Sequence, residues 1–454
     1  MDLTGRRMLV VGLGVSGLAA VRLLASRGAQ VIANDARTEA DLGERAMAAR
    51  AAGAELALGG HDPALFSSVD HIVVSPGVPK LDALDAAERA GVPIAGEVEL
   101  ASWFFEGGTV VAVTGTNGKS TVTALVGDMC RRTGRPTFVG GNLGTPLVEA
   151  VGTDAVKPGG FVVIELSSYQ LERVDRFRAD VSVLLNVSED HLDRHASFAE
   201  YAAAKGRIFH GQSRRDAAVV PSHDELCRSL ARAGAASLHC FGTPDGEVRV
   251  AAERIVNGHS SLSIPVTDLA IRGAHNLDNA CAAALSARLA GVPAEAIAAS
   301  LRSFRGLPHR MQSVGEVAGV EYLDDSKATN VGAAVAAIDG LADRGGRVVL
   351  IAGGVDKGGS YAPLRERMDR HGRALILLGE AASRIEQAFE GTALAVEHAS
   401  SMQDAVRLAH ALAQRGDAVL LAPACASFDM YPSYAHRGDA FQQAVHALRE
   451  EATR

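Results

Sequence analysis

The chain has 454 residues, 47% of them hydrophobic, and a formal net charge of −8. This length suffices for about three domains, each with its own core. Because proteins that bind nucleic acid present basic faces, the negative charge favours small-molecule partners and excludes nucleic acid from our expectations. The five cysteines lack C-x-x-C spacing, so they indicate neither a disulfide framework nor a zinc site.

The chain carries no signal for secretion or membrane insertion. No apolar run reaches the roughly 18 to 20 residues that a bilayer-spanning helix needs, and the N-terminal residues lack a charged-then-apolar leader. Unpaired cysteines suit a reducing compartment. We therefore expect a cytoplasmic protein. We also expect a monomer.

Apolar, strand-like runs alternate with helical stretches along the whole chain. This alternation predicts an α/β protein with parallel sheets and helices on their faces. A segment at 237–266 has mixed strand and turn signals and suggests an additional β excursion. The main expected strands are 8–11, 30–33, 71–74, 109–113, 161–165, 181–186, 348–352, 374–378 and 418–422.

Two breaks rich in Gly or Pro, near residues 106 and 307, divide the chain into three α/β domains. We expect an N-terminal Rossmann-like domain, a central P-loop ATPase-like domain with a parallel sheet, and a C-terminal Rossmann-like domain. Their expected bounds are 1–106, 107–307 and 308–454.

A glycine fingerprint follows the first strand. The run Gly12-Leu13-Gly14-Val15-Ser16-Gly17 opens a helix, and the next strand ends at the acidic residue Asp35. Such a turn holds a diphosphate at a helix N-terminus, and NAD is its usual ligand. Any diphosphate fits the same geometry, so an NAD-dependent oxidoreductase is one hypothesis among others. Ser75-Pro76-Gly77 adds a second turn at the same carboxyl edge of the sheet.

The most informative stretch is Gly115-Thr116-Asn117-Gly118-Lys119-Ser120, which ends an apolar strand and opens a helix. Its backbone N–H groups and the helix N-terminus can cradle phosphates, Lys119 supplies a positive charge, and Ser120 can ligate Mg²⁺. A standard P-loop would have its first glycine at position 113, where this chain has valine. The stretch predicts a nucleoside triphosphate as ligand.

Further polar residues follow strand ends in the central part of the chain. Glu165 ends an apolar strand, and a carboxylate beside a phosphate loop is typical of Mg²⁺ sites. His191 comes after the next strand; a lone histidine is more often structural than a ligand. Asn142 lies in a glycine turn, and its amide could face the phosphates or the metal.

Six ordered motifs resemble the successive signatures of the Mur ligases, the ATP-dependent amino-acid-adding enzymes of peptidoglycan assembly. The resemblance covers essentially the whole chain. The G-x-G-x-x-G start is shared with the L-alanine-adding enzyme of that family and argues against its two later ligases, and the chain lacks the Asp-Asn-Pro-Arg run expected of the meso-diaminopimelate-adding enzyme. The chain most resembles the D-glutamate-adding branch. The motifs lie at 115–120, 141–144, 165–170, 186–193, 275–279 and 325–330.

The resemblance implies an acyl-phosphate mechanism with ATP, D-glutamate and UDP-N-acetylmuramoyl-L-alanine as substrates, two Mg²⁺ ions and no NAD. It implies catalytic roles for Lys119, Glu165, His191 and Lys205, and metal binding by Ser120, Glu165, His191 and Lys205 as a carbamate. It implies ATP contacts from Gly115, Thr116, Asn117, Gly118, Lys119, Ser120, Thr121, Asn276, Asn279, Arg310 and Asp325. It implies contacts to the UDP substrate from Gly14, Val15, Ser16, Asp35, Arg37, Ser75, Pro76, Gly77 and Asn142, and to the amino acid from Lys327, Thr329, Lys357, Ser427, Phe428 and Tyr434.

Several alternatives stay open at this point. Ala36 and Tyr434 stand where the family pattern has threonine and phenylalanine. By sequence alone, Lys205 is an ordinary surface lysine of a helix, and Asn276 and Asn279 could cap a helix. Other hypotheses are an L-alanine-adding enzyme, a folylpolyglutamate synthase, an NAD-dependent dehydrogenase with an added nucleotide domain, and a P-loop switch without acyl chemistry.

Overall fold

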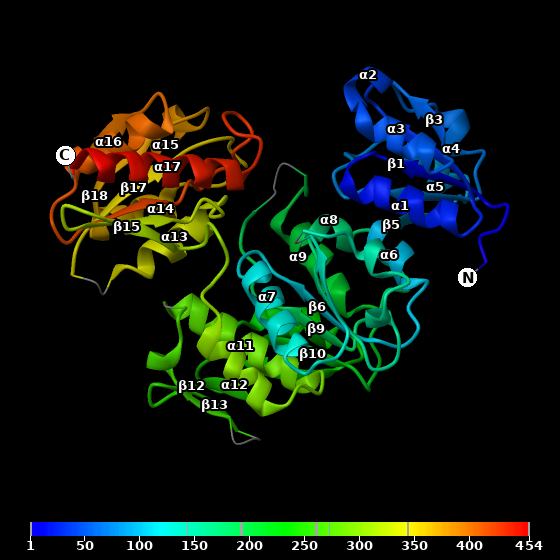
Figure 1. The fold of residues 1–454 in the computed structure, drawn as a ribbon, viewed down its shortest axis with the longest axis horizontal. Helices are drawn as coiled ribbons and strands as arrows, with labels where there is room; N and C mark the ends of the chain where they lie inside the picture. The colour runs from blue at the N-terminus through cyan, green and yellow to red at the C-terminus, as the bar shows by residue number, and fades with distance from the viewer. Residues whose placement is uncertain are drawn as a thin grey trace.

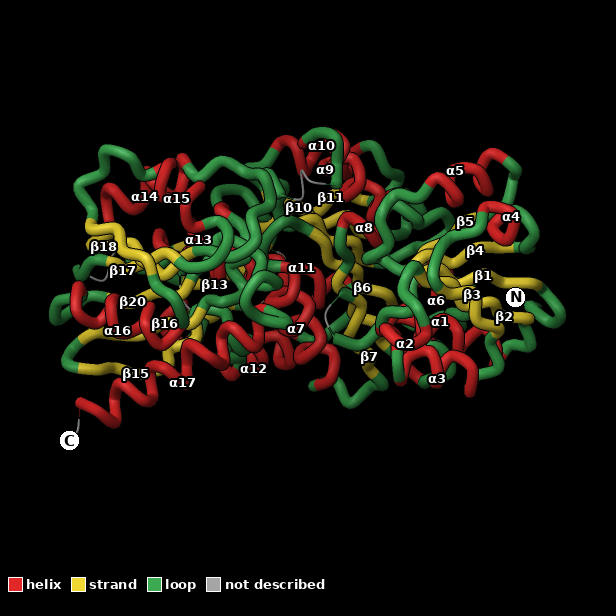
Figure 2. The backbone as a smooth tube through the Cα atoms, turned by 90° about the horizontal axis from the view of Figure 1, so that it is seen from above, coloured by secondary structure: helices red, strands yellow, loops and turns green. Residues whose placement is uncertain are grey.

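The computed structural model describes residues 2–142, 144–190, 194–258, 262–271, 273–342 and 345–452. Three sheets form three lobes, and the predicted α/β class is confirmed. In Figure 1 the N-terminal lobe (blue) and the C-terminal lobe (yellow to red) lie on opposite sides of the central lobe (cyan to green), and Figure 2 shows the same arrangement from above. No helix within the described ranges is long and apolar enough to cross a membrane.

The N-terminal domain is a parallel sheet of five strands in the order β3-β2-β1-β4-β5. The order reverses between β1 and β4, and ligands of open α/β sheets bind at such a switch point. The strands are β1 (Arg7–Val11), β2 (Gln30–Asp35), β3 (Glu55–Leu58), β4 (His71–Val74) and β5 (Ile94–Gly96). The helices are α1 (Val15–Ser26), α2 (Glu39–Leu42), α3 (Glu44–Ala51), α4 (Pro63–Phe66), α5 (Asp82–Arg89) and α6 (Glu97–Ser102).

The central sheet has the order β14-β13-β12-β11-β10-β9-β6-β8-β7, with β6 paired in parallel to β8 and β9. Helices cover both faces around β6, which is why its residues form a nearly continuous apolar run. The strands are β6 (Thr109–Thr114), β7 (Thr137–Gly141), β8 (Phe161–Glu165), β9 (Val181–Leu184), β10 (Ala217–Pro221), β11 (Ser237–Phe241), β12 (Val248–Ala251), β13 (Arg254–Asn257) and β14 (Ser263–Pro265). The helices are α7 (Lys119–Arg131), α8 (Ser168–Leu171), α9 (Phe198–Gly206), α10 (Glu225–Arg232), α11 (Ala274–Leu289) and α12 (Ala294–Ser303).

The C-terminal sheet has the order β15-β16-β20-β17-β18-β19, in which only β15 is antiparallel to its neighbour. The loops after β16, β17 and β20 therefore meet at one edge. The strands are β15 (Gln312–Val317), β16 (Val320–Asp324), β17 (Val348–Ala352), β18 (Gly372–Leu377), β19 (Ala395–His398) and β20 (Ala418–Leu421). The helices are α13 (Val331–Asp339), α14 (Ala362–His371), α15 (Ala382–Ala388), α16 (Met402–Leu412) and α17 (Tyr434–Ala452).

All nine main strands expected from the sequence are present, with ends that differ by at most two residues. The expected β excursion at 237–266 is also present: β12 pairs in parallel with β11, and β13 and β14 extend the sheet further by antiparallel pairing. The three sheets lie within Arg7–Gly96, Thr109–Pro265 and Gln312–Leu421, while the domain bounds at residues 106 and 307 stay predictions.

Candidate active site

The loop between β6 and α7 has the backbone of a phosphate cradle. Gly115 and Gly118 have φ of +151° and +85°, conformations that residues with a side chain rarely adopt. A Cβ on Gly118 would lie 2.3 Å from Oδ1 of Asn279, so glycine is required for close packing against α11. Lys119 folds back over the loop, and its Nζ donates to the carbonyl oxygens of Gly115 and Thr116 at 2.8 and 2.7 Å.

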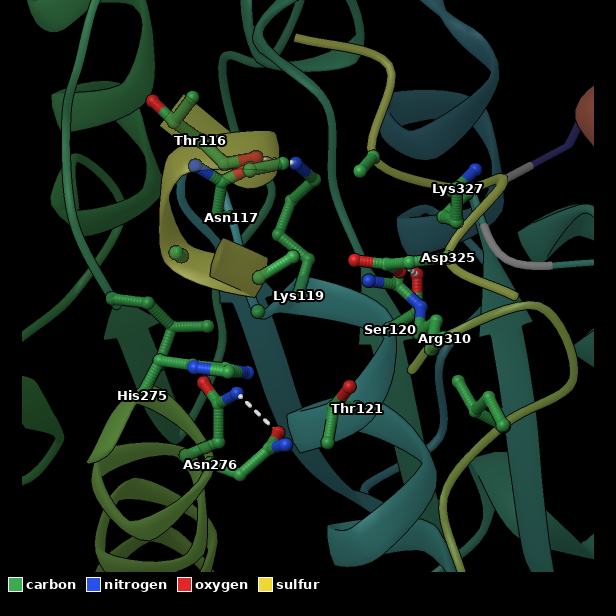
Figure 3. A pocket seen from close by; sticks show the side chains of 18 of the residues that line it. Thr116, Asn117, Lys119, Ser120, Thr121, His275, Asn276, Arg310, Asp325 and Lys327 are labelled. Atoms are coloured by element: carbon green, nitrogen blue, oxygen red, sulfur yellow. Dashed lines mark hydrogen bonds between the residues drawn. The ribbon is translucent and has the colours of Figure 1, made fainter. Parts of the chain in front are cut away.

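This loop faces a cavity of about 1000 Å³ between the central and C-terminal domains. In Figure 3, His275 and Asn276 lie on one side of Lys119, and Arg310, Asp325 and Lys327 lie on the other. The guanidinium of Arg310 donates to Oγ of Ser120 at 2.8 Å, which links the C-terminal domain to the loop. The predicted residues that line this cavity are Thr116, Asn117, Gly118, Lys119, Ser120, Thr121, Asn142, Glu165, Lys205, Asn276, Asn279, Arg310, Asp325, Lys327, Thr329, Lys357 and Phe428.

Glu165 is buried at the end of β8, beside the loop. One carboxylate oxygen accepts a hydrogen bond of 2.6 Å from the amide of Asn142, whereas the buried Oε2 has no hydrogen-bond partner. Burial opposes the charge on Glu165, but the positive charge of Lys119 and hydrogen bonds from Ser120 and Asn142 outweigh it and lower its pKa. Glu165 therefore stays ionised and presents an unsatisfied anionic oxygen.

Lys205 is buried, 2% exposed, so the interpretation of it as a surface lysine is wrong. Its Nζ donates to the carbonyl of Gly115 at 2.7 Å and lies 4.6 Å from the ring centre of Tyr201. Tyr201 is in turn hydrogen-bonded to Thr116 at 3.1 Å. Burial and the nearby charge of Lys119 bring the pKa of Lys205 well below its ordinary value, which favours the neutral amine.

A second cavity, of about 560 Å³, lies at the switch point of the N-terminal sheet and is lined by all nine residues predicted to contact the UDP substrate. Asp35 accepts the N–H of Leu13 at 2.8 Å and a two-pronged pair of bonds from Arg37 at 2.9 and 2.8 Å. The guanidinium of Arg37 lowers the pKa of Asp35 far below its usual value. Asn142 lines both this cavity and the larger one, so the two cavities meet at its side chain.

The residues predicted to contact the amino acid come from loops of the C-terminal domain. Nζ of Lys327 lies 3.9 Å from the ring centre of Tyr434, and Lys357 makes an ion pair of 3.3 Å with Asp190 of the central domain. Phe428 is 75% exposed at the cavity, while Ser427 is buried. Of the residues predicted around the larger cavity, Gly115, Ser427 and Tyr434 do not line it, and His191 lies outside the described residues.

Family models match three consecutive parts of the chain. They are the "Mur ligase MurD-like, N-terminal domain" at residues 6–96, the "Mur ligase middle domain" at 113–287 and the "Mur ligase, glutamate ligase domain" at 309–425. The chain belongs to the Mur ligase family.

Proteins described as UDP-N-acetylmuramoylalanine–D-glutamate ligase resemble this Mur ligase over nearly their whole length. The protein of Desulfosudis oleivorans is 44% identical over 99% of this chain and 98% of its own, and that of Anaeromyxobacter dehalogenans is 46% identical over 97% and 98%.

Solved structures share the fold of this Mur ligase. A pseudomurein peptide ligase type C from Methanothermus fervidus superposes with a TM-score of 0.63 at 19% identity, covering 98% of this chain and all of its own. The MurF ligase of Thermotoga maritima in complex with ADP gives a TM-score of 0.62 at 18% identity, covering 99% of both chains. At this identity the likeness establishes the three-domain fold alone.

Two side chains of this Mur ligase join the domains but were missed from the sequence. Asp190 is buried and accepts from Asn330 at 3.0 Å as well as from Lys357. Asn330 also caps α13 through a hydrogen bond from the N–H of Ala333. The sequence offered one indication of their importance: Asp190 and Asn330 are direct neighbours of the motif residues His191 and Thr329. The capping alternative for Asn276 and Asn279 is wrong, because both lie inside α11 after the N-cap Gly273.

Burial shifts the pKa values of one acidic and one basic group at the cavity. It raises the pKa of Asp325 to about 7 and lowers that of Lys327 to about 8. Arg310 opposes the first shift and adds to the second. An anionic ligand beside Lys327 would favour its charged form, so the site is electrostatically prepared for phosphate or carboxylate groups.

Proposed function

We propose that the protein joins D-glutamate to UDP-N-acetylmuramoyl-L-alanine by an ATP-dependent ligase reaction that releases ADP and phosphate. One observation carries the proposal: the cavity with the phosphate loop and the cavity with the diphosphate fingerprint meet at Asn142. A sugar nucleotide held in the second cavity can thus extend its carboxylate toward the γ-phosphate of ATP held in the first. The names of the full-length relatives support the choice of substrates.

The chemistry requires an activated carboxylate, because a carboxylate and an amine do not condense unaided. Transfer of the γ-phosphoryl group to the substrate carboxylate gives an acyl phosphate, and the amine of glutamate then displaces phosphate. Phosphoryl transfer depends mainly on positioning and charge neutralisation. Lys119 and Arg310 supply positive charge on two sides of the loop, and the N–H groups at the start of α7 orient the phosphates. Asn142 donates a hydrogen bond to the carboxylate of Glu165 and so positions it beside the loop.

The donor set fits magnesium. Mg²⁺ prefers oxygen ligands and retains water, and the buried Oε2 of Glu165 is an anionic oxygen without a partner. Ser120 and a carbamate on Lys205 would complete the protein ligands of two ions, together with His191. Among the described residues, no group of three or more His, Cys, Asp or Glu side chains could hold a metal by itself. When bound, Mg²⁺ neutralises charge on the transferring phosphoryl group.

A dicarboxylate amino acid needs cationic and hydroxyl partners, and the C-terminal loops supply them. Lys327, Thr329 and Lys357 line the larger cavity. Lys357 is held by Asp190, so its ammonium group is already directed to the boundary of the two domains. These positions support glutamate rather than a neutral amino acid as the third substrate.

The direct test is phosphate release from ATP and Mg²⁺ with UDP-N-acetylmuramoyl-L-alanine and each of D-glutamate, L-glutamate, D-glutamine and L-alanine. We expect release only with D-glutamate and only when the sugar nucleotide is present. Release with L-alanine and UDP-N-acetylmuramate would identify an L-alanine-adding enzyme instead. Thermal stabilisation by NAD but not by the sugar nucleotide would overturn the proposal altogether.

A further inference from the structure

A buried arginine lies beneath the C-terminal loops that carry the predicted amino-acid contacts. Arg437, in the first turn of α17, is only 2% exposed. Arginine is rarely buried without a carboxylate partner, because its charge loses its hydration. Within the described residues, no ion pair joins Arg437 to an acidic side chain. Its burial therefore requires an explanation.

Oxygen atoms of three separate loops solvate this guanidinium. Nε donates to Oγ of Ser326 at 3.0 Å, and one terminal nitrogen donates to the carbonyls of Ser326 and Cys425 at 2.9 and 3.1 Å. The other terminal nitrogen donates to the carbonyls of Ala426 and Gly353 at 3.2 and 3.4 Å. The planar fork of an arginine can make these five bonds at once, which a lysine cannot.

Each loop held in this way also carries a predicted contact to the amino acid. Ser326 directly precedes Lys327 in the loop after β16, and Ala426 directly precedes Ser427 in the loop after β20. Gly353 begins the loop after β17 that leads to Lys357. These loops belong to strands β16, β20 and β17, which are neighbours in the sheet and end at one edge.

The loops after β17 and β20 approach each other closely beside the guanidinium of Arg437. Val355 and Ala426 exchange two backbone hydrogen bonds of 2.9 and 3.0 Å. A Cβ on Gly354 would lie 2.0 Å from the carbonyl oxygen of Ala426 and 3.1 Å from the guanidinium. Burial lowers the pKa of Arg437 to about 10, which still leaves it charged at neutral pH.

We propose that Arg437 is a positioning residue for the amino-acid substrate: its guanidinium fixes the relative placement of the three loops that carry the predicted contacts Lys327, Lys357 and Ser427. The identity of the substrate in this proposal rests on the proposed function. The placement of the three loops by Arg437 does not depend on that function.

The kinetic test compares Arg437→Lys and Arg437→Met with the unmodified enzyme in the phosphate-release assay. We expect the KM for D-glutamate to rise about tenfold or more in both variants, as loss of hydrogen bonds to a charged group predicts, while the KM for ATP and for the sugar nucleotide stays within about threefold. The matched control is Arg373→Met. Arg373 is a partly buried arginine of the same domain, but it pairs with Asp417 at the opposite, amino edge of the sheet. Its loss should leave all three KM values nearly unchanged.

A second measurement does not depend on the substrate. Hydrogen exchange of Arg437→Lys should accelerate at 325–328, 353–357 and 425–428 and remain unchanged in β17 and β18. If a variant at Arg437 does not fold, Ser326→Ala removes one acceptor of the guanidinium and should raise the KM for D-glutamate about threefold. Equal increases of all three KM values, an unchanged KM for glutamate, or unchanged exchange in the loops would each overturn the role of Arg437. Accelerated loop exchange in an enzyme that does not use D-glutamate would overturn the proposed substrate and not the role of Arg437 in the loops.

Discussion

Glu165→Gln is the sharpest test of the proposed magnesium site. Glutamine has nearly the size of glutamate, and its amide oxygen can still accept the 2.6 Å hydrogen bond from Asn142. The substitution therefore retains the packing and that contact but removes the negative charge beside Lys119. Loss of one preorganised charged group in an active site typically costs about 10²- to 10³-fold in kcat, or about 2.7 to 4 kcal/mol. We expect a loss of this size, measured as ATP-dependent phosphate release at saturating substrates.

Glu97→Gln provides the matched control. Glu97 is likewise a buried carboxylate with one unpartnered oxygen, but it accepts from the N–H of Val148 and lines neither the cavity at the phosphate loop nor the cavity at the N-terminal switch point. This variant should retain kcat within about threefold. Thermal unfolding with increasing Mg²⁺ gives a second readout, because an ion that binds only the folded state raises its stability. A Glu165→Gln enzyme with near-parental kcat, or with an undiminished stabilisation by Mg²⁺ in the presence of ATP, would refute the assignment.

Four further predictions follow from the geometry. Lys205→Arg should lose at least about 10²-fold in kcat, since arginine cannot form a carbamate, and the unmodified enzyme should lose activity in CO₂-depleted buffer and regain it with bicarbonate; full activity of the variant would show that no carbamate is needed. Asp35→Asn should raise the KM for the sugar nucleotide about tenfold with that for ATP unchanged, because Asp35 orders both Leu13 and Arg37; a parallel rise in both values would contradict a local role. Lys357→Ala should raise the KM for D-glutamate far more than the other two, and equal effects on all three substrates would argue against glutamate binding there. Burial raises the pKa of Glu97 from 4.5 to about 7, so its ionisation costs the folded state free energy; stability should fall as pH rises from about 4.5 through 7, and Glu97→Gln should flatten this fall in urea titrations.

The sequence was sufficient to predict the features of the fold and of the candidate site that depend on short-range patterns. The strands with apolar runs and the loops at their carboxyl ends follow from composition and from glycine spacing, which is why the residues predicted for the UDP substrate line one cavity. The residues of the central domain that are predicted to bind ATP, such as Lys119 and Asn276, line another cavity for the same reason. In a parallel sheet, loops that follow neighbouring strands necessarily meet at one edge.

Burial and contacts between domains could not be derived in this way. A lysine in an alanine-rich helix has the same local pattern whether it faces solvent or protein, and only the packing of α9 places Lys205 against the carbonyl of Gly115. The contact of Asp190 with Asn330 and Lys357 depends on how the central and C-terminal domains are placed, which no periodicity encodes. Sequence patterns thus identify which loops carry chemistry, whereas distances across the cavity come from the tertiary structure.

Arg437 shows why some of the residues that organise a site have no signal in the sequence. It lies in the first turn of a polar helix, where a positive charge is locally unfavourable because the helix dipole is positive at that end. Its burial becomes intelligible only when the carbonyls of Cys425, Ala426 and the sequence-distant Ser326 are seen to surround it. A charge that is disfavoured locally is stabilised by tertiary contacts, and those contacts belong to the loops on which the proposed amino-acid site is built. The local conflict is therefore better explained by the site than by the helix.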